Sequence, residues 1–301
     1  MRLMKHLAST ALALGLAATA AAAHPLDGLT AEEYQKINQI LRDGKVVDDA
    51  TLYPLIELKE PAKADVLAWK EGDSLDRKAT VYFTGADGFG EAVVNITQGT
   101  VESNEKTKGQ PMVLFTEFMN ALEGVLGHPD MVAGLEKRGL KPEEAFCLPL
   151  TAGNFFTDEY TNSRLMKVPC YKVPDGSNFY AKPIEGLFAI YDIGRKEVLR
   201  VIDTGAIDVP KDGWGYTEEE VAKRVPLRAD FNPVKLVQDG GPNYKINGSH
   251  LEWDIWRLNF RVDKRPGLVI SNLDVNDDGT WRSVIYQTHL SEVFVPYMDP
   301  S

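Results

Sequence analysis

The sequence has 301 residues, of which 44% are hydrophobic and 26% charged, with 25 glycines and 17 prolines. These proportions are those of an ordinary globular protein, and they exclude a disordered, collagen-like or polytopic membrane chain. The 33 basic and 44 acidic side chains give a net charge of −11, which argues against a nucleic-acid partner because phosphates require a basic surface.

Residues 1–23 have the pattern of a secretory signal peptide. Arg2 and Lys5 precede an uncharged apolar stretch, and a run of small alanines ends at Ala23. The apolar stretch is too short for a lasting transmembrane span. We therefore expect export across a bacterial inner membrane, cleavage after Ala23, and a periplasmic product with no membrane attachment.

The first expected domain, residues 24–107, begins with a helix and continues with strands. Thr30 and Glu33 have the spacing of a capping box, apolar residues follow at helical spacing, and Gly44 ends the pattern. Strands are predicted at 52–58, 79–83 and 92–97. The polar stretch 98–110 has no apolar periodicity, so we expect the domain boundary there.

The second expected domain, residues 108–210, repeats the order of helix and then strands. An amphipathic pattern from Val113 to Leu126 predicts one helix, and 129–137 predicts a second, shorter one. Strands are predicted at 145–150, 165–173, 186–192 and 197–203. Helices followed by antiparallel strands, twice over, indicate the α+β class with two small domains.

Residues 211–248 are predicted to form a connector rich in proline and glycine, interrupted by one helix with a capping box at Thr217 and Glu220. Residues 249–301 have a β pattern. The apolar alternation changes phase between Ile255 and Trp256, which we interpret as a β-bulge. Further strands are predicted at 267–275, 280–290 and 293–297.

Cys147 and Cys170 are the two cysteines of the chain. In an oxidising compartment an even number permits one disulfide. Two separately buried thiols are an equally good interpretation, so the residues leave the pairing open.

Two short motifs resemble ligand sites. Residues 274–279 match the opening of a calcium loop, but Ile285 stands where a glutamate would be required, so we predict a hairpin turn. Gly85, Gly88 and Gly90 do not have the spacing of a dinucleotide-binding loop and are predicted to form an ordinary loop.

The histidines left after cleavage do not form a local metal pair, because no two are spaced i, i+2 or i, i+4; they are His24, His128, His250 and His289. His24 could chelate copper through its new amino group and its imidazole only with a distant further ligand. The residues by themselves indicate an exported scaffold without a visible catalytic constellation.

Several stretches resemble bacterial copper-containing primary-amine oxidases of the tyramine or phenylethylamine oxidase type. The similar segments, in the family's order, are HPLDGLTAEE (24–33), KPIEG (182–186), VIDTG (201–205), LEWDIW (251–256), RPGL (265–268) and SEVFVPYMDP (291–300). The resemblance implies two small, cystatin-like α+β domains followed by the first strands of an incomplete antiparallel β-sandwich, the catalytic domain, in residues 249–301.

The resemblance also implies the oxidation of primary amines to aldehydes, with release of ammonia and hydrogen peroxide. The family is homodimeric and uses copper and topaquinone, a quinone made from one of its own tyrosines. An Asp acts as general base, and three His hold the copper. In the family these residues follow the segment similar to 291–300, in stretches resembling F-D-x-G-E, N-Y-[DE] and H-x-H.

None of those stretches occurs in the 301 residues, so the resemblance assigns no catalytic, cofactor-binding or metal-binding residue. Tyr244 follows Asn243 but precedes Lys245, and it is not a quinone precursor by this pattern. We expect an N-terminal fragment that binds neither copper nor topaquinone and is inactive alone. It would come from a truncated or split gene, or be an incomplete sequence of a longer polypeptide; if the gene is split, a C-terminal half would be its partner. The alternative is a non-catalytic periplasmic binding or accessory module on the same scaffold.

Overall fold

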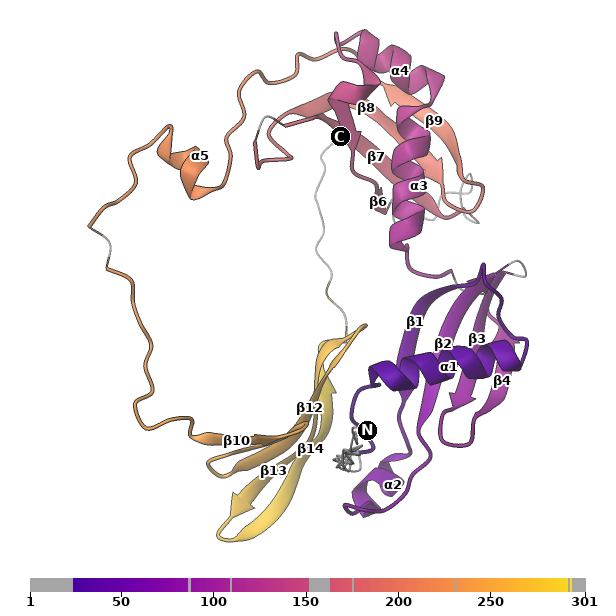
Figure 1. Cartoon of the computed structure of the whole chain (residues 1–301), viewed down its shortest axis with the longest axis vertical. Helices are drawn as coiled ribbons and strands as arrows, with labels where there is room; N and C mark the ends of the chain where they lie inside the picture. Colours follow the sequence, from indigo (N-terminus) through magenta and orange to yellow (C-terminus); the bar gives the residue numbers. More distant parts are fainter. Residues whose placement is uncertain are drawn as a thin grey trace, which may run out of the picture.

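The computed structural model describes residues 24–85, 88–108, 110–151, 163–174, 176–230, 232–291 and 293. These residues form three antiparallel sheets in chain order, and helices pack on the first two (Figure 1). The predicted α+β class is therefore confirmed. The predicted leader, 1–23, and most of the predicted strand 293–297 lie outside the described residues.

The first domain packs one helix on a four-stranded sheet. Helix α1 (Ala31–Asp43) begins with the predicted capping box: the Thr30 hydroxyl accepts from the Glu33 amide, and the Glu33 carboxylate accepts from the Thr30 amide. Ile37 and Leu41 of α1 are fully buried against Val81 and other sheet residues. The sheet order is β1 (Leu52–Lys59), β2 (Lys78–Gly85), β3 (Gly88–Asn95) and β4 (Thr100–Lys106), with α2 (Lys63–Ala68) between β1 and β2 in the chain.

Two predictions for this domain are wrong. The stretch 98–110 contains strand β4, which has no apolar alternation because most of its side chains are exposed. Gly88 and Gly90, predicted in a loop, lie in β3. Gly90 faces Phe83 across the hairpin, and a Cβ atom there would stand 2.7 Å from the Phe83 ring, so the close approach requires glycine. The boundary after residue 107 stays a prediction.

The side chain of Asn95 fixes the turn between β3 and β4 from inside the domain. It is fully buried, and its Nδ2 donates to Asp76 Oδ2 at 2.9 Å and to Glu102 Oε1 at 3.0 Å. Its Oδ1 accepts from the Gln98 amide at 3.0 Å. All the polar atoms of this buried amide are therefore paired with protein groups, as burial requires.

The second domain has a separate core. Helices α3 (Phe115–Leu126) and α4 (Pro129–Glu136) pack on a sheet ordered β5 (Ala145–Cys147), β7 (Leu165–Lys172), β8 (Pro183–Asp192) and β9 (Glu197–Asp203), and β6 (Leu150–Thr151) pairs with β7. A 3-10 turn, Pro142–Glu144, precedes β5. The predicted strand 145–150 is two strands, because Pro149 has no N–H to donate.

The predicted helix in the connector is confirmed as α5 (Glu218–Ala222), with the Thr217–Glu220 capping box in place. The third sheet is a five-stranded antiparallel meander: β10 (Tyr244–Asn247), β11 (His250–Trp253), β12 (Trp256–Asp263), β13 (Gly267–Asp277) and β14 (Thr280–His289). Strand β10 lies within the predicted connector, 211–248, so that prediction is wrong at its C-terminal end.

The predicted β-bulge between Ile255 and Trp256 is also wrong. Trp253 pairs directly with Trp256, so the chain reverses through a two-residue turn in which Asp254 has a φ of +53°. A bulge and a two-residue turn both shift the alternation by an odd number of residues, so the sequence pattern is the same.

The calcium-like motif, residues 274–279, contains a two-residue hairpin turn, as predicted. Asp277 pairs with Thr280, and the two residues between them, Asp278 and Gly279, both have positive φ angles. The Asn276 side chain accepts from the Gly279 amide at 2.7 Å. This is the backbone pattern of a type I′ turn, for which Asp-Gly is a favoured pair.

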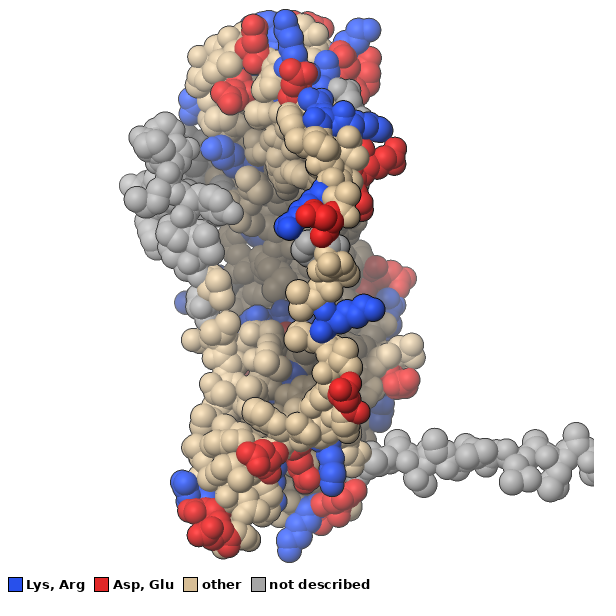
Figure 2. All heavy atoms as spheres, turned by 90° about the vertical axis from the view of Figure 1, so that its left-hand side faces the viewer, with Lys and Arg blue, Asp and Glu red and all other residues tan. Residues whose placement is uncertain are grey.

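Charges of both signs are mixed on the face shown in Figure 2, with no continuous basic stripe. Within the described part of the chain, every helix is too short or too polar to cross a membrane.

Candidate functional site

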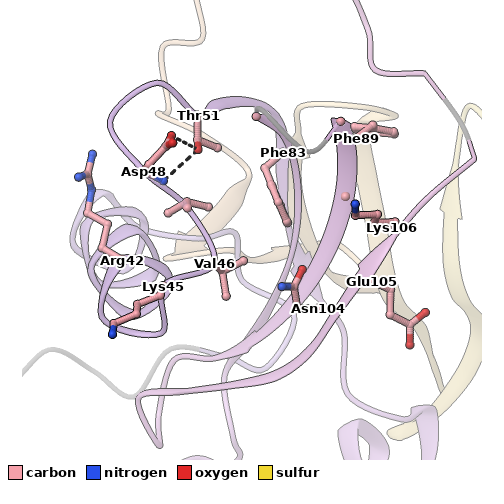
Figure 3. Close-up of a pocket in the computed structure, with 14 residues that line it drawn as sticks. Arg42, Lys45, Val46, Asp48, Thr51, Phe83, Phe89, Asn104, Glu105 and Lys106 are labelled. Carbon is pink, nitrogen blue, oxygen red and sulfur yellow. Dashed lines mark hydrogen bonds between the residues drawn. The ribbon is translucent and has the colours of Figure 1, made fainter.

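A cavity with a volume of about 570 Å³ lies at one end of the first domain (Figure 3). The last turn of α1 and the segment after it supply Arg42, Lys45 and Asp48 to one side. Strands β2 and β4 supply Phe83 and Lys106 to the other. Cationic, anionic and aromatic groups thus share one concave surface.

Asp48 forms hydrogen bonds with Thr51 in the wall of this cavity. The Thr51 hydroxyl donates to Asp48 Oδ1 at 2.7 Å and accepts from the Asp48 amide at 3.0 Å. The hydrogen bond from Thr51 lowers the pKa of the Asp48 carboxyl, so this group is a poor proton acceptor at neutral pH. The cavity therefore offers a polar binding surface.

A smaller cavity of about 270 Å³ lies between the second domain and the connector, and Glu220 is one of the residues that line it. The Glu220 carboxylate accepts from the Ser177 hydroxyl, from the Ser177 amide at 2.9 Å, and from the Thr217 hydroxyl at 2.8 Å. These hydrogen bonds, the one from the Ser177 hydroxyl above all, lower the pKa of Glu220 to about 2. Sequence reasoning found the bond to Thr217 but not the one to Ser177, which lies 43 residues away.

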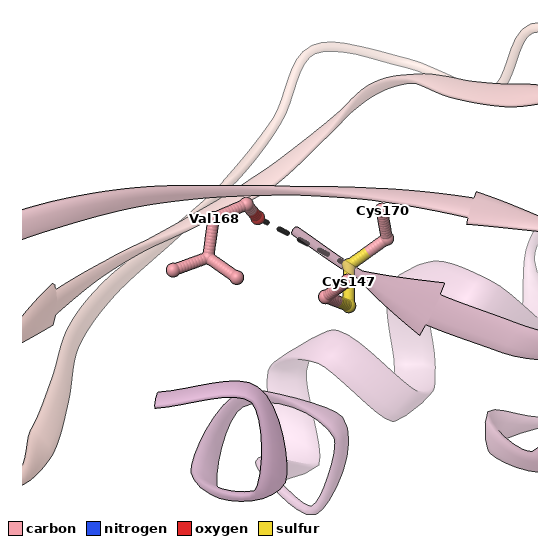
Figure 4. The surroundings of a disulfide bond; sticks show 3 residues. All are labelled: Cys147, Val168 and Cys170. Carbon is pink, nitrogen blue, oxygen red and sulfur yellow. Dashed lines mark hydrogen bonds between the residues drawn. A yellow bond between two sulfur atoms is a disulfide. The ribbon is translucent and has the colours of Figure 1, made fainter. Parts of the chain in front are cut away.

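The two cysteines form a disulfide, which answers the question that the sequence left open (Figure 4). Cys147 of β5 and Cys170 of β7 are directly opposite in the sheet, and both are buried in the core of the second domain. Neither is a free thiol, so neither is available as a nucleophile or metal ligand.

The structure places the histidines at four structural positions. His24 Nδ1 accepts from the Leu26 amide at 3.1 Å, and its ring meets Trp69 edge-on. Burial lowers the pKa of His24, the Asp27 carboxylate opposes this effect in part, and the charge of the nearby His250 adds to the lowering. His128 caps α4, as its predicted place at a helix end implies, and His289 lies in β14.

The proximity of His24 and His250 is a long-range relation that sequence spacing missed. It does not make a metal site: over the described ranges, no three side chains of His, Cys, Asp or Glu are grouped so that they could hold a metal ion. Tyr244 lies exposed in the terminal strand β10, opposite Trp253. The described residues thus bring together binding surfaces and structural contacts.

Three family models match the chain in order. An AGAO-like N2 domain matches residues 30–104, the copper amine oxidase N3 domain matches 116–214, and the copper amine oxidase enzyme domain matches 245–301.

Curated proteins give the same result at the level of sequence. The chain is 32% identical over 288 residues to a histamine oxidase of Arthrobacter globiformis, and 32% identical over 287 residues to the copper-containing amine oxidase gamma 1 of Arabidopsis thaliana. It is 31% identical over 282 residues to a primary amine oxidase of Arthrobacter sp. strain P1. These alignments cover 92–94% of this chain but 40–42% of the relatives, so the chain spans about two fifths of their length.

Among solved structures, a copper-containing benzylamine oxidase from Hansenula polymorpha is similar with a TM-score of 0.72 and 21% identity. The similarity covers 89% of this chain and 44% of that one. At this identity the comparison supports the fold alone.

Proposed function

We propose that this chain is the N-terminal part of a primary-amine oxidase. It consists of copper amine oxidase N-terminal domains and part of an enzyme domain, and it is homologous to bacterial primary amine oxidases at 31–32% identity. The complete enzyme would convert a primary amine, oxygen and water into an aldehyde, ammonia and hydrogen peroxide. The observation that carries the proposal is the order of the three matched domains, together with coverage of nearly all of this chain and about two fifths of its relatives.

Copper and topaquinone are the cofactors of the family, and the described residues do not fit either group. They contain no cluster of metal-ligating side chains, and no N-Y-[DE] sequence occurs anywhere in the 301 residues. We therefore assign no step of the chemistry to residues of this chain. The groups that would bind copper and form the quinone are proposed to come from the part of the relatives that this chain does not match, in the same polypeptide or in a second one.

The role proposed for the described residues is to provide the scaffold on which the enzyme domain is completed. The third sheet leaves large apolar side chains exposed, among them Val262 at 80% and its cross-strand partner Leu268 at 56%. A sandwich covers such a face with a second sheet. The complete enzyme is further proposed to be a homodimer, since copper amine oxidases are generally dimeric.

The proposed substrates are aromatic primary amines such as tyramine or phenylethylamine. The names of two similar proteins specify histamine and benzylamine, whose amino groups are joined to an aromatic ring through a short alkyl chain, whereas another relative is named copper methylamine oxidase. A panel of these amines, supplied to the complete enzyme, would rank them by kcat/KM.

The experiment that tests the proposal compares the 301-residue chain with the same chain completed by the coding sequence downstream of codon 301. Both are given copper, oxygen and tyramine, and hydrogen peroxide is measured. We expect no turnover by the 301 residues alone and turnover with a quinone absorbance band after completion. Sustained peroxide production by the 301 residues, or downstream DNA that encodes no F-D-x-G-E, N-Y-[DE] and H-x-H stretches in any frame, would contradict the proposal.

The proposed location is the periplasm, with His24 as the first residue after removal of the leader. The His24 main-chain nitrogen donates to Asp27 Oδ2 at 2.8 Å, and a free amino group there would gain a charged partner. Intact-mass measurement of the chain from a periplasmic extract should give a protein that begins at His24. A product that retains residues 1–23 would refute the cleavage.

A further inference from the structure

Glu60 connects the first domain to the third sheet. It follows β1 in the first domain, and its carboxylate is ion-paired with the Arg261 guanidinium of β12. Gln287 of β14 donates to the same carboxylate, at 2.8 Å to Oε1 and 3.0 Å to Oε2. The Arg261 side chain is only 9% exposed, so this ion pair is largely removed from water.

A second contact lies beside the first. The Ser249 hydroxyl, between β10 and β11, donates to the Asp27 carboxylate near the start of the first domain. Arg261 also donates to the Leu26 carbonyl at 3.4 Å. The two contacts involve residues separated by 201 to 235 positions in the chain, so they are tertiary contacts between two units.

Two cation–π contacts also join the two units. In one the lysine belongs to the third sheet, and in the other it belongs to the first domain. The Lys264 ammonium lies 4.3 Å from the ring centre of Tyr34 in α1, and the Lys63 ammonium of α2 lies 4.9 Å from that of Tyr286 in β14. Each unit thus contributes one lysine and one aromatic ring to these contacts, so the two surfaces are complementary.

The face of the sheet that carries these residues is buried although it belongs to neither domain core. Arg261 is opposite Val269, and Gln287 is opposite Ser271, so the four share one face. Val269 is 1% exposed and Ser271 2% exposed, yet neither is in the two hydrophobic cores. A single sheet cannot bury its own face, and the first domain is the unit in contact with it (Figure 1).

The covalent route between the units is long, and the contacts given for its α5 part are with the second domain rather than the first. It leaves the second domain, passes through α5, and continues through exposed residues such as Val234 and Leu236. Such a connector does little to orient the sheet on the first domain.

We propose that the unit β10–β14 docks on the first domain as a non-covalent module with Glu60 as its anchor, and that it stays bound when the connector is cut. The inference concerns this chain alone and is independent of the proposed chemistry. The occupant of the first domain's surface is thus a segment of the same polypeptide, recognised by the Glu60 and Asp27 carboxylates.

The test places a site-specific protease sequence between Val237 and Gln238 of the full chain, with an affinity tag on the N-terminal part. After cleavage, the tagged part is captured and its mass in solution is measured by light scattering on a sizing column. We expect the two parts to elute together as a 1:1 complex. Separate elution of the C-terminal part, or its recovery only in aggregates, would overturn the proposal.

Charge variants then locate the contact. Glu60→Arg puts a positive charge against Arg261, and we expect the Kd of the cut parts to rise by at least about 30-fold. The exchange Glu60→Arg with Arg261→Glu should restore binding to within about tenfold, which shows that the first variant still folds. Glu219→Arg in α5, which reverses an exposed charge away from the contact, is the matched control. Equal effects of Glu60→Arg and Glu219→Arg would also refute the anchor role.

Discussion

At the scale of single residues, the Arg138 side chain makes several hydrogen bonds within the second domain. Its guanidinium is almost completely buried and donates to the Gly134 and Gly205 carbonyls, to the Glu185 carbonyl, and to Asp203 Oδ1 at 2.9 Å. Lysine 137 and this arginine hold the pKa of Asp203 well below its usual range. The five donors of one guanidinium therefore join the end of α4 to the edge of the sheet.

Arg138→Met should lower the free energy of unfolding of the second domain by about 3 kcal/mol, because it leaves a carboxylate and several carbonyls without their buried donor. Urea unfolding at pH 7 measures the change. Arg195→Met is the matched control, since Arg195 is mostly exposed and its ion pairs with Asp192 and Glu197 are 3.7 Å long. We expect the control to cost less than about 1 kcal/mol. Equal costs would mean that the Arg138 contacts contribute little.

Glu220 gives a pH dependence whose sign follows from its lowered pKa. Its pKa is about 2 in the folded chain and 4.5 as the ordinary value, so the contact with Ser177 stabilises the fold fully above about pH 4.5. That stabilisation is lost as the pH falls from about 4.5 toward 2. Protection of the Ser177 amide against hydrogen exchange should therefore decrease over this window. In Glu220→Gln the protection should be low at pH 7 already; unchanged protection in this variant would contradict the assignment.

At the scale of elements, the sequence predicted best where the signal is local. The α1 and α5 capping boxes and the Asp278-Gly279 turn depend on residues within four positions, and all three are present in the structure. Strand β4 was missed because its exposed side chains remove the apolar alternation on which strand prediction relies. The turn at Asp254 was read as a bulge because it lacks the glycine that marks most two-residue turns.

The disulfide joins two elements that are neighbours in the sheet, β5 and β7, across a sequence separation of 23 residues. Replacing both cysteines by alanine should lower the free energy of unfolding of the second domain by about 3 kcal/mol, because a loop of this size gains much entropy when it is released in the unfolded chain. Urea unfolding of the variant measures the loss. Wild-type protein in reductant should give the same value. If the variant were as stable as the oxidised protein, the covalent link would be dispensable.

At the scale of the whole molecule, the residues that the structure describes form two separate hydrophobic cores that share no residue. One is centred on Ile37 and Val94, and the other on Leu135 and Leu187. Each core has its own helix packing on its own sheet. Two such units are expected to unfold as separate cooperative systems rather than as one.

Calorimetry of the chain should therefore resolve more than one transition. Only the second domain contains the disulfide, so a reductant should shift its transition to lower temperature and leave that of the first domain in place. The Arg138→Met variant should shift the same transition, which identifies it independently. A single transition that moves as a whole would show that the cores are coupled.

Contacts between distant parts are where sequence reasoning stopped. Glu60 and Arg261 have no local signature, since each is a charged residue next to or within a strand, and their pairing depends on how a unit 200 residues later returns to the first domain. The same is true of His24 and His250. The resemblance to amine oxidases gave the lineage, and it did not give these partners.

The buried side chain of Asn95 has a practical consequence for the choice of expression host. Asn95-Ile96-Thr97 is an acceptor sequence for N-linked glycosylation, and so is Asn247-Gly248-Ser249, whose serine binds Asp27. A eukaryotic secretory pathway adds glycans to chains before they fold. A sugar on Asn95 would have no space in the folded first domain. A sugar on Asn247 would be attached to strand β10 of the docked sheet. Bacterial export, which adds no such glycan, is compatible with both positions.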